Sequence, residues 1–180
     1  MSLKNNDISY GSMTRFLHWT TAIIIIGMLA FGFFMGDMPK AYKPTIYMLH
    51  KSFGLLVLGL VIIRIIWHIC TGKPAYAKAL NRMEQILSTA GHHTLYLLMI
   101  IMPMTGLFMS IAAKRYPSFF GIFTVNIPGI PQTKYFGGLM NQAHEILAWF
   151  FIGLIVLHVG AALHHKIRGN GVFERMAGKK

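Results

Sequence analysis

Four long apolar runs constrain this chain of 180 residues more than any other feature. They lie at about 16–35, 46–71, 93–113 and 140–165, and Arg64 is the one cation deep inside a run. As a helix, each run is long enough to cross the ~30 Å hydrocarbon layer of a bilayer, where only structures that satisfy their own backbone hydrogen bonds are stable. The sequence therefore predicts an all-α integral membrane protein, with a single membrane domain over 1–180 folded as a four-transmembrane-helix bundle.

Positive charge gathers in the segments between these runs and gives the chain a net charge of +12. Four spans place both ends of the chain on one side of the membrane, and eleven of the 17 Lys and Arg residues fall on that side. These eleven are Lys4, Arg15, Arg64, Lys73, Lys78, Arg82, Lys166, Arg168, Arg175, Lys179 and Lys180; the other six are Lys40, Lys43, Lys51, Lys114, Arg115 and Lys134. The positive-inside rule predicts that both termini are cytoplasmic. Charges that flank membrane spans indicate contact with lipid, and no nucleic-acid partner is expected.

Two histidines fourteen residues apart, His144 and His158, lie in the last run, and no charged residue lies between Glu145 and His158. Fourteen residues return to nearly the same helix face about 21 Å further along the axis. His18 begins the first run and His50 begins the second, at the opposite membrane surface. Alternating helix directions therefore match His18 with His158 in depth near the inner surface, and His50 with His144 near the outer surface.

Each matched pair can supply the two axial imidazoles of one haem b. The predicted iron ligands are His18 and His158 for an inner haem, and His50 and His144 for an outer haem. The chain has no CxxCH motif, so either haem is held without a covalent bond. The alternative is that histidines at helix ends are amphipathic anchors. That alternative requires four matched depths to arise by accident, and it is weakest for His158, which lies within the apolar run.

Two cations are candidate cofactor contacts. Arg64 lies fourteen residues after His50, on the same helix face but at inner depth, and the runs offer no carboxylate to neutralise it beside the inner haem. A propionate of that haem is one candidate partner, and snorkelling to the inner headgroups is the other. Lys51 follows His50 at the outer surface, where it can contact a haem propionate or a lipid phosphate.

The sequence around these residues resembles the prokaryotic cytochrome b561 family, the four-helix di-haem b proteins of the bacterial inner membrane. The matching segments, which together contain all four histidines, are RFLHWTTA, YMLHKSFGLLVLGLVIIRIIW, GHHTLYLLMIIMPMTGL and QAHEILAWFFIGLIVLHVGAALHH. The resemblance as a whole extends over nearly the entire chain. The resemblance implies two haems b on the four predicted ligands and a multi-pass location in the bacterial inner membrane.

The resemblance also implies electron exchange with the quinone pool, with ubiquinone or menaquinone as the partner. Superoxide oxidation at the periplasmic face, coupled to ubiquinone reduction, is an activity associated with the family. The six cations expected on the outer side would attract such a small anion. Two other functions stay open at this stage. The chain can instead be the haem b anchor subunit of a dehydrogenase or hydrogenase, with a protein redox partner, or a histidine-lined metal-ion transporter without haem.

Overall fold

A computed structural model describes residues 2–77 and 80–178 of the chain. The four longest helices are α1 (Ser12–Phe34), α2 (Lys43–Thr71), α3 (Arg82–Ala112) and α4 (Lys134–Ile167), and each is long and apolar enough to cross a membrane. A short antiparallel hairpin of β1 (Ser118–Phe119) and β2 (Phe123–Thr124) separates α3 from α4, and α5 (Val172–Ala177) follows α4. The prediction of an all-α membrane bundle with four spanning helices is confirmed.

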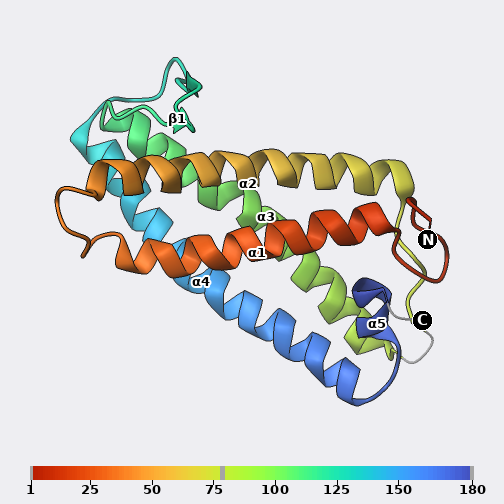
Figure 1. Cartoon of the computed structure of the whole chain (residues 1–180). Helices are drawn as coiled ribbons and strands as arrows, with labels where there is room; N and C mark the ends of the chain where they lie inside the picture. Colours follow the sequence, from red (N-terminus) through yellow and green to blue (C-terminus); the bar gives the residue numbers. More distant parts are fainter. Residues whose placement is uncertain (1, 78–79, 179–180) are drawn as a thin grey trace.

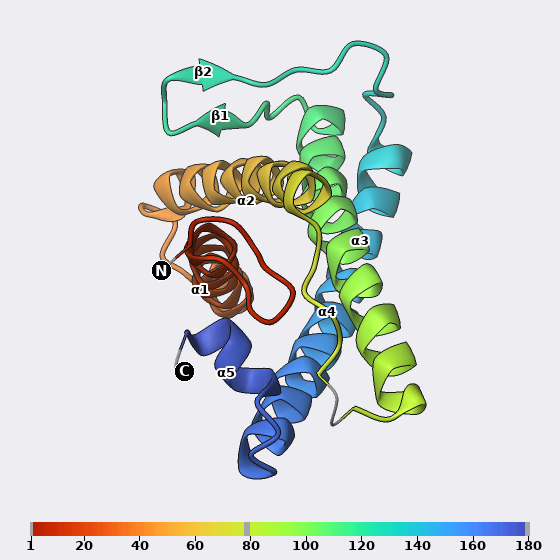
Figure 2. The same ribbon diagram turned by 90° about the vertical axis from the view of Figure 1, so that its right-hand side faces the viewer.

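The helices pack in sequence order, α1 on α2, α2 on α3, and α3 most extensively on α4. Both ends of the chain lie at one end of the bundle, and α4 diverges from α1 toward that end (Figure 1). We call this the terminal end, and we call the opposite end, which carries β1 and β2, the hairpin end. Seen along α1 and α2, the hairpin lies over α2 and α5 lies beside α1 (Figure 2).

α3 and α4 begin well before their apolar runs, and each begins at a residue whose N-terminal neighbour caps the helix with its side chain. α3 begins at Arg82, where Asn81 accepts a hydrogen bond from the Glu84 N–H at 2.9 Å and Glu84 accepts one from the Asn81 N–H at 2.9 Å. This reciprocal capping box adds three turns before the apolar run. α4 begins at Lys134, with the Thr133 hydroxyl accepting from the Phe136 N–H at 3.2 Å.

A small core lies at mid-height in the bundle, while most large apolar side chains point outward. The buried cluster takes residues from all four long helices: Ile25, Val57, Val61, Leu98, Met99 and Phe151. Outward-facing residues such as Ile23, Ile66 and Leu157 are 68%, 56% and 70% exposed. An apolar exterior around a helical bundle is the surface that lipid tails require.

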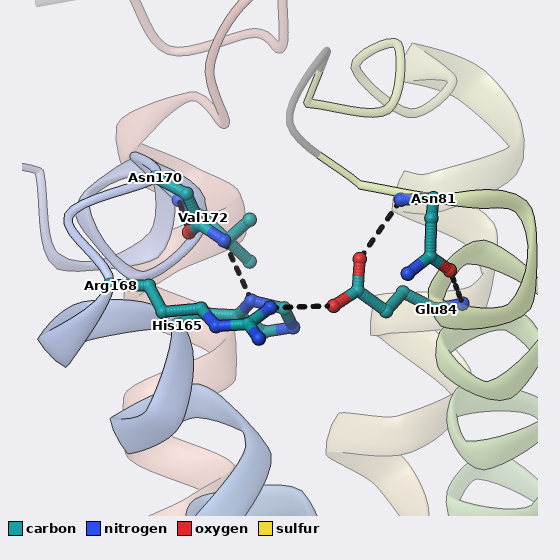
Figure 3. Close-up of polar contacts among 6 residues, drawn as sticks. All are labelled: Asn81, Glu84, His165, Arg168, Asn170 and Val172. Carbon is teal, nitrogen blue, oxygen red and sulfur yellow. Dashed lines mark hydrogen bonds and ion pairs between the residues drawn. The ribbon is translucent and has the colours of Figure 1, made fainter.

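The terminal end is closed by the two ends of the chain. Asn5 donates to Thr71 Oγ1 at 3.1 Å and to the Gly72 carbonyl at 2.7 Å, which fixes the N-terminal segment to the end of α2. Arg168, just after α4, pairs with Glu84 at 3.2 Å (Figure 3). Trp19 of α1 donates to the Met176 carbonyl of α5 at 3.3 Å. Three of the eleven cations assigned to this side, Lys78, Lys179 and Lys180, lie outside the described residues.

Candidate functional site

Two pairs of histidines face each other across the bundle, one near each end. His18 of α1 and His158 of α4 have ring centroids 6.3 Å apart, and His50 of α2 and His144 of α4 also have ring centroids 6.3 Å apart. These are the pairs expected from depth. α4 contributes one ring to each pair because its fourteen-residue spacing keeps both histidines on the face turned toward α1 and α2.

This spacing fits two imidazoles that share one iron. A metal ion about 2 Å from a nitrogen of each ring holds the ring centres about 6 Å apart. Among the described residues, no group of three or more His, Cys, Asp or Glu side chains is placed to hold a metal ion. Each pair offers two imidazoles, which suits a planar cofactor that supplies its other ligands itself.

His144 is held in one orientation by α3. Its Nδ1 lies 3.0 Å from Thr105 Oγ1 and 3.1 Å from the Met102 carbonyl. The Thr105 hydroxyl donates to that carbonyl at 2.7 Å, so the protonated Nδ1 of His144 donates to these two oxygens. The lone pair is then on Nε2. Histidines that bind metals usually have their second nitrogen anchored in this way.

Two glycines lie against the rings at the hairpin end, and a Cβ at Gly106, but not one at Gly32, would crowd its ring. A Cβ on Gly106 would lie 3.1 Å from Cε1 of His144, and one on Gly32 would lie 3.6 Å from Cε1 of His50. Gly54 lies four residues after His50 in α2, and a Cβ there would meet only Met28, at 3.9 Å. The structure adds Thr105, Gly106 and Gly32 to the site. Sequence reasoning missed them because each acts on a histidine of another helix.

His50 carries a polar atom that the protein leaves unsatisfied. Its Nδ1 is buried and has no hydrogen-bond partner among the described residues. A buried nitrogen without a partner is unfavourable unless a ligand or a bound group satisfies it. This is a second observation, independent of ring spacing, that fits a cofactor at the hairpin end.

Arg64 lies at the terminal-end pair, as its fourteen-residue offset from His50 predicts. Its Nη2 is 3.4 Å from His18 Nδ1, its Nη1 is 3.8 Å from Met99 Sδ, and its guanidinium lies over the Tyr96 ring at 5.2 Å. Within the described residues it has no carboxylate partner.

A small cavity adjoins this guanidinium. Its lining consists of Thr14, Leu17, Arg64, Trp67, His68 and Tyr96. The Trp67 indole N–H donates to Thr14 Oγ1 at 3.0 Å, and Thr14 donates to Asn5 Oδ1 at 2.7 Å, so the N-terminal segment borders the cavity. A cationic and aromatic lining of this kind suits an acidic group.

His92 of α3 is a third imidazole at the terminal end. Its ring centroid is 5.6 Å from that of His158, with the planes at 75°. Its Nδ1 is 3.4 Å from Ser88 Oγ on the preceding turn. His92 therefore borders the pair of His18 and His158, on the same helix as Tyr96.

The ammonium group of Lys51 is hydrogen-bonded to a backbone carbonyl. Its Nζ donates to the Arg115 carbonyl at 2.9 Å, just beyond the end of α3. The next residue, Ser52, accepts from the Phe120 N–H at 2.9 Å and donates to the Ser118 carbonyl at 2.7 Å. Lys51 and Ser52, which directly follow His50 in α2, thus connect α2 to the segment after α3 and to the hairpin.

Comparison with known proteins gives one consistent result. The family model described as prokaryotic cytochrome b561 matches residues 9–179. The chain is 33% identical to cytochrome b561 homolog 2 of Escherichia coli strain K12, over 99% of the chain and 96% of that protein. It is 28% identical to the probable superoxide oxidase CybB of Yersinia pestis, over 95% of the chain and 97% of that protein.

Proposed function

This chain belongs to the prokaryotic cytochrome b561 family of membrane electron-transfer proteins, and on that premise we propose that it carries electrons through two haems b between a periplasmic donor and membrane quinone. The observation that carries the proposal is that a facing pair of histidines with the same spacing occurs at both ends of the bundle. Two histidine pairs have the same 6.3 Å separation, and α4 supplies one ring to each.

The four histidines would hold the two cofactors, His50 with His144 at the hairpin end and His18 with His158 at the terminal end. A bound haem b supplies a reversible one-electron iron centre. With two imidazoles of the protein as its ligands, each iron would carry out outer-sphere electron transfer and would not bind oxygen. Thr105 and the Met102 carbonyl keep the His144 ring oriented, and the apolar helices exclude water.

Arg64 would neutralise a haem propionate at the terminal end. If His18 binds iron through Nε2, its Nδ1 carries a proton and becomes a donor, as the guanidinium is. Two donors then face each other 3.4 Å apart, and both require an acceptor. A carboxylate beside the cavity satisfies both, so Arg64 favours a propionate over a lipid phosphate. Lys51 can reach an outer propionate only by giving up its bond to the Arg115 carbonyl.

The donor we propose is superoxide, as the name of the Yersinia pestis relative suggests. Oxidation of two superoxide anions releases two O₂ and two electrons, and these electrons with two protons reduce one quinone to quinol. Six cations, Lys40, Lys43, Lys51, Lys114, Arg115 and Lys134, belong to the connections and helix starts that we assign to the periplasmic side. Such a charge distribution raises the local concentration of a small anion.

The positive-inside rule supports a cytoplasmic location for the terminal end in the bacterial inner membrane. Electrons would then enter at the hairpin end and cross inward. We propose ubiquinone or menaquinone as the acceptor. His92 and Tyr96, which border the terminal-end pair, are the candidate contacts for its carbonyl oxygens.

The test uses the purified chain in liposomes that contain ubiquinone. Enzymatically generated superoxide should produce quinol, and higher ionic strength should lower the rate because salt screens the cationic surface. A chain whose haems are reduced by dithionite but not by superoxide would contradict the proposed donor. Quinone reduction by the chain alone also separates this function from that of an anchor subunit, which needs its catalytic partner.

A further inference from the structure

A layer of buried apolar side chains fills the interior of the bundle midway between the two histidine pairs. Ile25 lies seven residues after His18 and Val57 lies seven residues after His50. Seven residues are about two helical turns, or about 10.5 Å along the axis. Both residues are buried and both belong to the central cluster. The layer is therefore the same distance from a histidine on each of the two helices.

α4 adds one buried residue to this layer. Phe151 lies seven residues after His144 and seven before His158, and it is 4% exposed. It is the only buried residue of α4, whereas its neighbour Phe150 is 57% exposed. Leu147, Leu154 and Ile155 of α4 pack against the cluster and are only partly buried.

The position of Phe151 follows from how the helices pack. α4 packs closely on α3 and much less on α1 or α2. The Phe151 ring nevertheless joins a cluster that includes Ile25 of α1, Val57 of α2 and Met99 of α3. The large Phe151 side chain therefore spans the gap between the backbone of α4 and the backbones of α1 and α2.

We propose that Phe151 is the positioning residue that separates the two haem sites and forms the medium for the electron that passes between them. This inference rests on the proposed di-haem function. In the step, one electron leaves the reduced site and arrives at the oxidised site, and no bond forms or breaks. The ring keeps the centre of the bundle packed and free of water, so the electron crosses a filled apolar layer.

The only cysteine, Cys70, offers a way to test this. It is exposed near the end of α2 at the terminal end. A ruthenium photoreductant attached there should reduce the terminal-end haem first, and the later transfer to the hairpin-end haem appears as a second kinetic phase. The substitutions are F151L, which keeps an apolar side chain but removes the ring, and F151A, which leaves a void.

The matched control is F150L, the same substitution one residue earlier on the exposed face of α4. We expect F151L and F151A to keep two haems per chain while the second phase slows several-fold, with the larger change in F151A. F150L should retain the wild-type rate. Haem content and both midpoint potentials, measured by redox titration, show whether the sites themselves are intact.

Two results would overturn the inference. One is a wild-type second phase in F151L with both haems present. The other is loss of haem from F151L, because a residue that only separates the sites is not required to hold the cofactors. The haem count of the wild-type chain tests the proposed function independently of either variant, so the two failures are distinguishable.

Discussion

At the scale of single residues, the site at the hairpin end is specified by contacts that cross from α3 to α4. Thr105 and the Met102 carbonyl orient the His144 ring, and Gly106 lets that ring approach α3. Side chains that support a metal ligand keep its ring oriented, and mutating them usually lowers metal affinity. The site therefore requires a glycine at position 106 as specifically as it requires a hydrogen-bond partner for His144, although Gly106 has no side chain to contact a cofactor.

Replacing Gly106 by Ala should weaken the hairpin-end haem. The new Cβ would lie 3.1 Å from Cε1 of His144, so the ring must shift by a few tenths of an ångström relative to the oxygens that orient it. Disturbing such a supporting shell lowers affinity on the order of 10–100-fold. Haem titration of the haem-free chain measures this change, and the terminal-end haem should bind as before.

The matched control is G91A in the same helix, where a new Cβ would meet nothing within 4 Å. Alanine is the better helix former by about 1 kcal/mol, so G91A should bind both haems as the wild type does. Equal haem affinity in G106A and G91A would show that the ring of His144 does not depend on this close approach.

At the scale of elements, α3 organises the site, because it packs on α4, anchors His144 and borders the pair of His18 and His158 through His92. Its first three turns lie before the apolar run and depend on the capping box of Asn81 and Glu84. Glu84 also pairs with Arg168, so the start of α3 is tied to the end of α4 (Figure 3).

Removing the cap with N81A should destabilise the start of α3 by about 1 kcal/mol, since an N-cap residue satisfies an otherwise unpaired backbone N–H. Hydrogen exchange of residues 82–91 measures the effect locally. R168Q removes only the ion pair, whose arginine side chain is 57% exposed, and should change exchange by less. A larger effect in R168Q than in N81A would mean that the ion pair, and not the cap, holds this end of the helix.

At the scale of the whole molecule, the sequence was sufficient to predict the four spans and which histidines meet. Apolar runs show what can cross a membrane, and fourteen-residue spacing on α4 determines the depth of each ring. The beginning of α3 could have been predicted from Asn81 and Glu84, but an estimate based on hydropathy alone starts the span at 93.

Contacts between helices could not be predicted from the sequence. The bonds from Thr105 to His144 and from Ser52 to the hairpin depend on rotation and register between elements that no local pattern specifies. Phe151 illustrates the same limit, because thirteen phenylalanines look alike in an apolar chain and only packing shows which one is buried. Lys51 was expected at a propionate or lipid, and the structure pairs it with a carbonyl after α3.

The central claim, two haems on four histidines, is tested most directly by one measurement. Oxidised and dithionite-reduced optical spectra of the detergent-purified chain, with haem quantified per polypeptide, should show two low-spin haems b. H144A should retain only the terminal-end haem and H158A only the hairpin-end haem. A wild-type chain that binds no haem in cells able to supply it, or that keeps two haems in both variants, would contradict the account.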